Sequence, residues 1–348
     1  MKHFILLAIT FLFCSFEVSS QSFSTRLSNG EKLFFSITDS STKRVEIVSL
    51  KSLNGVQSSL PSGTLQIPST VKYNGSTYFV MSIGEGAFAG ADELTSVLIP
   101  SSIINIGAKA FSGCSKLESI VFPSCKPQIG NNAFEGCRSL SSISFGSDWT
   151  SVDLQLFADA KSLNRVLIPA KAVKVTGVKQ LPALQRIDVD PNNKAFSSND
   201  GMLYSRDGKI FYACPNAKSG EVSIKFGTET VLSDAFAGCV RVSRLLLPES
   251  IHEFDYDEFA DCSRLSSITI KSEMPPITAK WNGSTVFAIK APNQYCAVYV
   301  PKEYLSRYRE SVCNAEGTYE TLAKAQKTEY GSNDIIGKKS IKRIKKLG

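Results

Sequence analysis

A phenylalanine returns at a fixed interval along this chain of 348 residues. Successive members of one series lie 23 residues apart, and two later phenylalanines have the same spacing. A period of this length indicates that each copy is one small structural unit, which must stack on its neighbours because it cannot bury its apolar face alone. The chain is therefore predicted to form one elongated solenoid, anchored at Phe88, Phe111, Phe134, Phe157, Phe236 and Phe259.

Each repeat also carries two apolar residues with a single residue between them. This spacing places both side chains on one face of a strand, and stacked copies form a parallel ladder with an apolar interior. A proline follows the pair in six coils and should mark the end of the strand, because proline cannot donate a ladder hydrogen bond. About ten short strands are predicted, at Leu65/Ile67, Val97/Ile99, Ile120/Phe122, Ile143/Phe145, Val166/Ile168, Ile187/Val189, Val222/Ile224, Leu245/Leu247, Ile268/Ile270 and Val298/Val300.

Three steps between successive pairs are longer than the rest, at 32, 35 and 30 residues. A coil must close on itself at every turn, so the extra residues are predicted to leave the wall of the solenoid. The first excursion lies near Asn74, the second is a hairpin insertion at about 190–215, and the third surrounds Trp281. Alternating strand residues on either side of Asp207 and Gly208 indicate the hairpin.

Eight cysteines follow residue 20, and an even number in an exported protein is compatible with disulfides. Four of them, Cys114, Cys137, Cys239 and Cys262, lie three residues after an anchor phenylalanine, where another coil has Ala91. A position that accepts alanine or cysteine favours a small buried apolar group. Buried free thiols are therefore the favoured interpretation, and disulfides remain the alternative.

The two ends of the chain differ from the repeat. Residues 1–20 combine Lys2 with a short apolar run and small residues before Gln21, which predicts a cleavable signal peptide. A lipid anchor at Cys14 is disfavoured, because Phe13 stands where a small residue is required. Residues 21–63 are predicted to form a β-hairpin cap. Residues 306–348 are assigned to a C-terminal cap and a disordered basic tail, which supplies six of the seven net positive charges.

The stretches IGEGAFAGADELTSVLIP and IGAKAFSGCSKLESIVFP resemble the BspA-like leucine-rich repeat family of bacterial secreted and surface proteins. The resemblance covers roughly residues 60–305, and the solenoid is assigned to 64–305. It implies a right-handed coil with turns and short helical segments opposite the ladder, and a secreted or surface-displayed binding protein. Leu156, Asp159 and Val178 depart from the pattern, so their coils are expected to pack loosely or to bend the array.

Residues with catalytic or metal-binding chemistry are sparse. His252 is the one histidine after residue 20, and it lies where neighbouring coils carry ordinary surface residues. The carboxylates around it lack the ordered spacing of a calcium loop and are better explained as a solvated acidic face; they are Glu249, Glu253, Asp255, Asp257 and Glu258. Asp188, Asp190, Asn192 and Asn193 form a second oxygen-rich group, but such residues also build turns. We therefore predict no enzyme, no cofactor and no metal site.

The outward face of the ladder is the predicted binding site. The residue between the two buried members of each pair must point away from the core, and this column contains more aliphatic and aromatic side chains than a plain solvent face requires. Arginines occupy a neighbouring column, and arginines beside apolar anchors are common at interfaces; the alternative is that these residues merely suit a strand. The site comprises Leu98, Val121, Leu167, Leu246, Tyr299, Arg165, Arg186 and Arg244.

The predicted function is a non-enzymatic, adhesin-like protein, secreted or at the cell surface, with a periplasmic location as an alternative. It would bind a protein or glycan, such as a host extracellular-matrix protein. Nucleic acid is not expected as a partner. No stretch after the predicted signal peptide is apolar and long enough for a transmembrane span. A structural or scaffolding role in the bacterial envelope is the alternative. A hydrolase that uses the insertion is a third, less favoured class.

Overall fold

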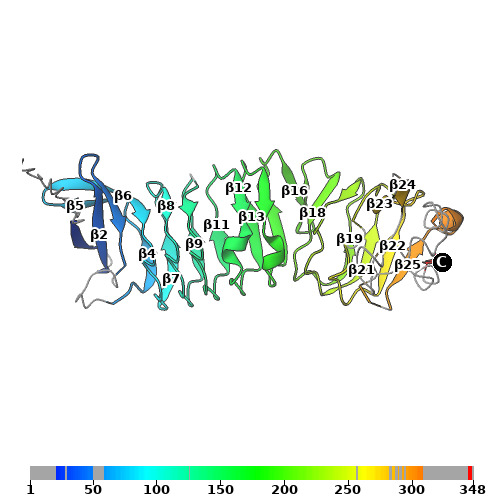
Figure 1. The fold of residues 1–348 in the computed structure, drawn as a ribbon, viewed down its shortest axis with the longest axis horizontal. Coiled ribbons are helices and arrows are strands. Elements are labelled where there is room, and N and C mark those ends of the chain that lie inside the picture. Colours follow the sequence, from blue (N-terminus) through cyan, green and yellow to red (C-terminus); the bar gives the residue numbers. More distant parts are fainter. Residues whose placement is uncertain are drawn as a thin grey trace, which may run out of the picture.

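The computed structural model describes residues 21–27, 30–49, 59–124, 126–255, 258–281, 284–286, 289, 292–293, 295–308 and 344–346. The predicted signal peptide lies outside the described residues, as does most of the predicted basic tail. The described part is an elongated solenoid in which short strands succeed one another along the long axis (Figure 1).

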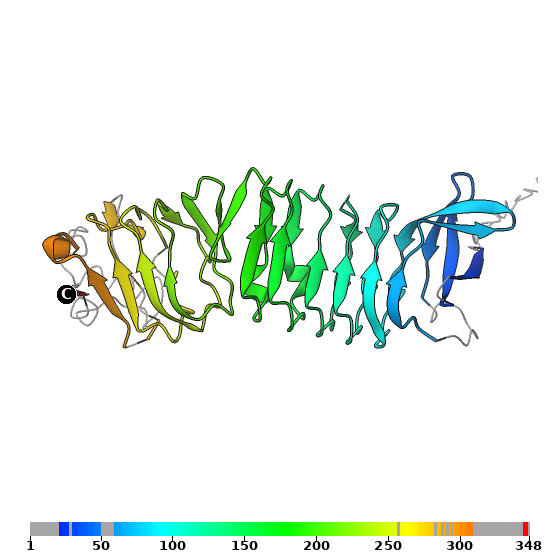
Figure 2. The ribbon, with the colours of Figure 1, turned by 180° about the vertical axis from the view of Figure 1, so that it is seen from behind.

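The main ladder consists of the ten predicted strands, which pair in parallel in three groups. Figure 2 shows them side by side along one wall. The apolar pairs lie within these strands or directly beside them, which confirms the predicted ladder. The strands are β4 (Gly63–Gln66), β7 (Leu94–Leu98), β9 (Ser119–Val121), β11 (Ser142–Ser144), β13 (Arg165–Ile168), β15 (Arg186–Val189), β19 (Gly220–Ser223), β21 (Val242–Leu247), β22 (Ser267–Ile270) and β25 (Ala297–Val300).

The opposite side of the coil carries a second parallel ladder, where the sequence predicted only turns and short helical segments. Most of its strands have two or three residues. In β8, β10, β12 and β20 these are the apolar residue five positions before the anchor phenylalanine and one or two neighbours of that residue. Short 3-10 helices, η2 (Leu154–Phe157) and η3 (Val178–Gln180), occur in two coils. The strands of this ladder are β6 (Ser76–Ile83), β8 (Asn105–Ile106), β10 (Gln128–Ile129), β12 (Ser151–Asp153), β14 (Lys174–Thr176) and β20 (Thr230–Val231).

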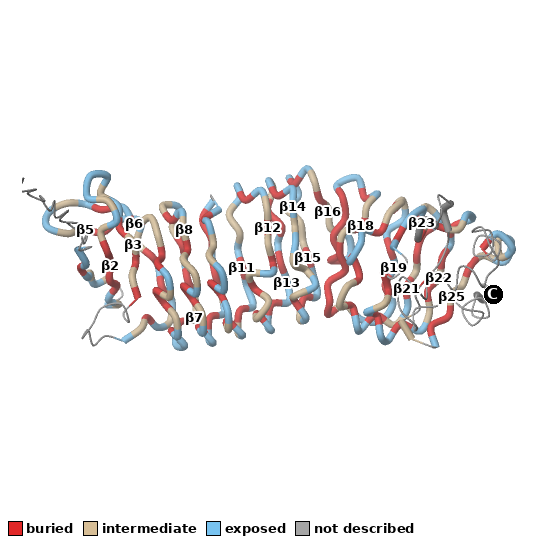
Figure 3. The backbone as a smooth tube through the Cα atoms, viewed as in Figure 1, coloured by how far each residue is buried: buried red, intermediate tan, exposed pale blue. Residues whose placement is uncertain are grey.

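The anchor phenylalanines stack in the interior between the two ladders. The ring centroids of Phe88 and Phe111 are 5.1 Å apart, those of Phe111 and Phe134 are 5.5 Å apart, and those of Phe134 and Phe157 are 5.1 Å apart. Each such aromatic pair stabilises the fold by about 0.5–1.5 kcal/mol beyond the burial of its area. Buried segments accordingly alternate with exposed turns along the whole solenoid (Figure 3).

Cysteines fill the position three residues after the anchor. The Sγ atoms of Cys114 and Cys137 donate to the carbonyl oxygens of Phe88 and Phe111 in the preceding coil, each at 3.3 Å. The predicted buried thiols are confirmed for Cys114, Cys137, Cys239 and Cys262, which are free and buried. Cys214 is also a buried free thiol, and Cys296 is buried. Cys125 and Cys313 lie outside the described residues.

Glycines allow adjacent coils to approach each other closely. A Cβ atom on Gly107 would lie 2.6 Å from the backbone nitrogen of Glu85, and one on Gly130 would lie 2.5 Å from the backbone nitrogen of Ala108. Real Cβ atoms do not come this close to a backbone atom, so these positions exclude any other residue. Gly113 meets a different need, since its φ of 76° lies in the left-handed region that glycine adopts without strain.

The coils that depart from the repeat keep some of its interior positions buried and leave others partly exposed. Asp159 replaces a glycine, and its Oδ2 atom accepts a hydrogen bond from the backbone nitrogen of Gly136 at 2.9 Å. Val178, at the anchor position, is only half-buried, but Leu181 and Leu184 beside it are fully buried. Leu156 and Asp159 line a cavity of about 540 Å³, so the expectation that these coils pack loosely or bend the array stays a prediction.

The insertion is a small sheet of its own. Strands β16 (Phe196–Asn199), β17 (Met202–Ser205) and β18 (Ile210–Ala213) pair antiparallel, and β18 then pairs in parallel with β20. Both faces of β17 are buried: Leu203 belongs to the apolar core on the N-terminal side, whereas Met202 and Tyr204 belong to the core on the C-terminal side. The insertion thus forms a partition between two cores, rather than a loop outside the wall.

Hairpins also occupy the other two predicted excursions and the N-terminal cap. Near Asn74 the chain forms a hairpin of β5 (Thr70–Tyr73) with β6, and near Trp281 one of β23 (Ala279–Trp281) with β24 (Ser284–Val286). The cap pairs β2 (Lys32–Asp39) with β3 (Arg44–Ile47), as predicted, and β1 (Ser22–Arg26) adds to β2. At the other end, β26 (Ile344–Lys346) pairs in parallel with β25.

Candidate functional site: the outward face of the strand ladder

The predicted apolar column lies on the outward face of the main ladder. Leu98 pairs with Val121, and their exposed fractions are 36% and 40%; Leu167 pairs with Asp188 and is 50% exposed. Leu246 and Tyr299 are half-buried and lie in register on either side of Thr269. Because the ladder is divided into three hydrogen-bonded groups, the structure brings these residues together in three sets and not in one continuous column: Leu98 with Val121, Leu167 by itself, and Leu246 with Tyr299.

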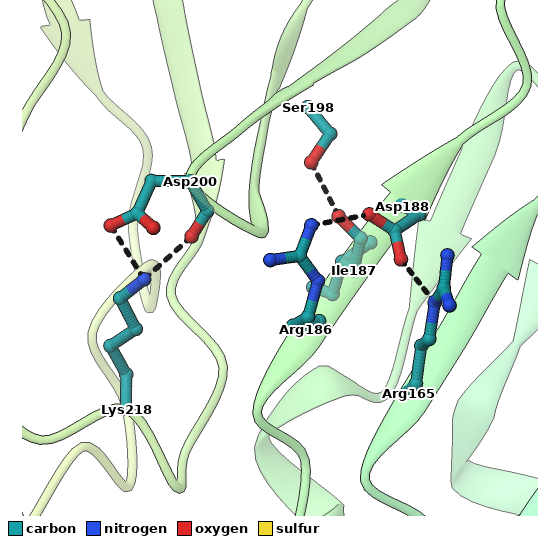
Figure 4. A network of polar contacts seen from close by, with 7 residues as sticks. All are labelled: Arg165, Arg186, Ile187, Asp188, Ser198, Asp200 and Lys218. Carbon is teal, nitrogen blue, oxygen red and sulfur yellow. Dashed lines mark hydrogen bonds and ion pairs between the residues drawn. The ribbon is translucent and has the colours of Figure 1, made fainter.

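The predicted arginines are held by carboxylates. The Arg165 Nε atom lies 2.5 Å from Asp188 Oδ2, and an Arg186 terminal nitrogen lies 3.0 Å from Asp188 Oδ1 (Figure 4). Arg244 pairs with Glu221 across β19 and β21 at 3.1 Å. The guanidinium groups are therefore positioned in advance, and each retains further donors because arginine has five N–H groups.

Asp188 is the centre of this polar cluster. Partial burial by itself would raise the pKa of its carboxyl, but the hydrogen bonds and charges of Arg186 and Arg165 outweigh that effect and lower the pKa. Its side chain is 16% exposed, whereas those of the two arginines are more than half exposed. The carboxylate thus stays ionised and holds two cationic side chains at the surface.

A groove lies where β15 meets the insertion. Two hydrogen bonds tie the strands together: the backbone nitrogen of Ile187 donates to the carbonyl oxygen of Gly201 at 2.7 Å, and the Ser198 hydroxyl donates to the carbonyl oxygen of Ile187 at 2.6 Å. The cavity has a volume of about 320 Å³. It is lined by Arg186, Asp188, Val189, Ser197, Ser198, Asp200, Gly201 and Arg206.

Sequence reasoning missed the half of this groove that comes from the insertion. Asp200 is held by Lys218, whose Nζ atom lies 2.7 Å from Asp200 Oδ2 and 2.5 Å from the Asp200 carbonyl oxygen (Figure 4). Arg206 follows β17 and lines the cavity. The only available signal was the excursion itself, because the 23-residue spacing does not extend into it.

A second small hollow lies near Leu246. It has a volume of about 160 Å³ and is lined in part by Phe226, Leu247 and Pro248. Phe226 is 77% exposed and was not among the predicted site residues. It follows a strand at a turn, outside the outward column, so the column rule could not find it.

The residues considered for catalysis or metal binding have structural roles. Asp190 accepts a hydrogen bond from the backbone nitrogen of Asn192. The buried Asn193 accepts from two backbone nitrogens of the same turn and donates to two carbonyl oxygens of the preceding coil. His252 is exposed. Within the described ranges, no group of three or more histidine, cysteine, aspartate or glutamate side chains is placed to hold a metal ion.

Glu249, Glu253 and Asp255 around His252 are exposed, as expected for a solvated acidic face, but Glu258 is an exception. It occupies the position directly before the anchor Phe259, where most other coils have alanine, and it is only 5% exposed. Its Oε1 atom accepts a hydrogen bond from the backbone nitrogen of Phe236 at 2.7 Å, while Oε2 has no partner among the described residues. Desolvation by burial raises the pKa of Glu258 to about 8.

These features define a leucine-rich-repeat solenoid with a polar groove on its ladder face. More specifically, the chain belongs to the BspA family: six copies of the BspA type leucine rich repeat region match residues 81–199 and 204–283, more than half of the chain. This match confirms the family indicated by the repeat. It includes all of β13 and β15, and most of the insertion.

Several solved structures are similar to this chain. The pneumococcal vaccine antigen PcpA is 17% identical with a TM-score of 0.49, and the match covers 84% of this chain and 96% of PcpA. A leucine-rich repeat protein from Bacteroides ovatus is 19% identical with a TM-score of 0.43, over 80% of this chain and 79% of that one. No curated protein matches. None of the helices in the described part of the chain is long and apolar enough to cross a membrane.

Proposed function

We propose that this protein is a non-enzymatic binding protein, exported by the signal peptide at residues 1–20, that captures a protein or glycan at a cell surface. The observation that carries the proposal is the surface around β13 and β15. There, the exposed Leu167 lies in register with Asp188, which holds Arg165 and Arg186 in fixed positions. Arginines that are already ordered lose little side-chain entropy on binding, and an apolar anchor beside them is common at binding hot spots.

The proposal is tested by reversing the chemistry of this surface. We expect the double variant Leu167→Glu/Arg165→Glu to lose capture of surface ligands in a pull-down with extracellular-matrix proteins, glycans and envelope fractions. A matched control, Val173→Glu/Lys174→Glu, makes the same change in charge at two exposed residues at the start of β14, on the opposite ladder. Equal capture by the two folded variants would refute the proposal.

A structural role in the envelope is the second candidate, and it is supported by the six basic residues between Lys338 and Lys346. Such a block attracts anionic lipid or polysaccharide. In this case, deletion of residues 338–348 would release the protein from the cell, and the ladder variants would leave its attachment unchanged. Retention of the deletion variant at the surface would exclude this role.

A further inference from the structure

We propose that the groove between β15 and the insertion binds an acidic sugar, that is, a saccharide ring that carries a carboxylate. The inference rests on the proposed function and deepens it by naming the ligand class of this surface. The groove residues are Arg186, Asp188, Ser197, Ser198, Asp200, Gly201 and Arg206, and they come from the ladder and from the insertion together.

The charges around the groove leave one cation unmatched at its lining. Asp188 is taken by Arg165 and Arg186, and Asp200 is taken by Lys218. Arg206 forms no ion pair with any residue that the structure describes, and it is exposed. Of the two arginines and two aspartates that line the groove, Arg206 is therefore the one left to pair with a charged ligand, and its guanidinium favours an anionic group. A guanidinium can bind a carboxylate through two parallel hydrogen bonds.

The remaining lining favours hydroxyl groups over an apolar ligand. The Ser197 hydroxyl donates its proton to the carbonyl oxygen of Ser205 at 2.7 Å, and the Ser198 hydroxyl donates to Ile187. Both oxygens thus keep acceptor capacity for the hydroxyl protons of a ligand. The carboxylates of Asp188 and Asp200 accept in the same way. Val189 is the only large apolar residue of the lining, and no aromatic ring contributes to it.

The size and rigidity of the groove suit one or two sugar rings. Its volume of about 320 Å³ lies near the lower end of the range for small-molecule sites. Gly201, with a φ of 73°, lies against Arg186, and a Cβ atom there would approach the Arg186 Cγ atom to 3.1 Å. The turn therefore packs directly on the arginine and restricts its side chain before the ligand arrives, which lowers the entropic cost of binding.

Calorimetric titration of the mature chain with a galacturonic acid trisaccharide tests the proposal, and the fully methyl-esterified trisaccharide serves as the ligand control. We expect saturable binding of the acid and at least about tenfold weaker binding of the ester, because esterification removes the charge-assisted hydrogen bonds. Arg206→Gln should weaken binding of the acid about tenfold. Arg138→Gln, at an exposed arginine in a distant turn, should leave it unchanged.

Absence of binding by the acid, or equal binding of acid and ester, would overturn the assignment. Equal affinity for poly-L-glutamate would overturn it in favour of an acidic protein segment. The outcome is separable from that of the proposed function. If the trisaccharide fails to bind while Leu167→Glu/Arg165→Glu still abolishes surface capture, only the acidic-sugar assignment falls.

Discussion

Replacing Glu258 by glutamine should remove a steep pH dependence of stability. The carboxyl is 5% exposed, and burial raises its pKa from 4.5 to about 8. Between these values the unfolded chain is ionised at this position while the native protein keeps the proton, so the native state loses stability as the pH rises. Linkage amounts to about 1.4 kcal/mol for each pH unit, which gives about 5 kcal/mol between pH 4.5 and pH 8 and no further loss above pH 8.

Urea denaturation at pH 5, 6, 7, 8 and 9 measures this effect. Glutamine resembles the protonated acid in shape and keeps an oxygen that can accept from the backbone nitrogen of Phe236. The free energy of unfolding of Glu258→Gln should therefore exceed that of the unmodified protein by a difference that grows up to pH 8. The exposed Glu135→Gln serves as the control. A pH-independent difference between Glu258→Gln and the unmodified protein would refute the reasoning.

Three further outcomes are expected. Gly130→Ala should lower the free energy of unfolding by about 2 kcal/mol or more in thermal or urea denaturation, because the new Cβ atom would lie 2.5 Å from the backbone nitrogen of Ala108. An unchanged midpoint of denaturation would show that the coils can separate without cost. Cys114 and Cys137 should resist a thiol reagent at pH 8 until the protein unfolds, because burial raises the pKa of each thiol to about 12; rapid labelling of the native protein, followed by mass spectrometry, would contradict this. Asp188→Asn should destabilise the protein at pH 7 and have little effect at pH 2. A carboxyl of lowered pKa stabilises the native state above its unfolded pKa and loses that contribution as the pH falls. Equal destabilisation at both pH values would exclude the ion pairs as the cause of the loss.

Much of the solenoid could be predicted from the sequence because its packing is periodic. Phe111 contacts Phe88 and Phe134, each one coil away, so the interior environment of one coil repeats in the next. Cys114 and Cys137 follow the same rule, and the thiols are buried as their position indicated. The same logic also marked where the pattern stops, at the three excursions.

Where the pattern is broken, the contacts could not be predicted from the spacing. The carboxylate of Asp159 takes the place of a backbone acceptor for Gly136, which the loss of a glycine did not indicate. Glu258 was counted with the exposed carboxylates around His252, although its position in the repeat is the buried alanine position. In both cases the neighbouring coil decided the environment of the carboxylate, which accepts a hydrogen bond from a backbone nitrogen of that coil.

The sequence by itself determined the repeat, the ladder and the column of outward residues on β13 and β15, because each depends only on a constant spacing between neighbouring coils. Tertiary structure alone decided the groove. Gly201, Arg206 and Lys218 lie in or after the insertion, where no period relates them to Arg186, and they reach it because the insertion folds back as a sheet between the two cores. The hairpin turns and the burial of the insertion bring these residues near Arg186, and a periodic pattern does not encode either of them.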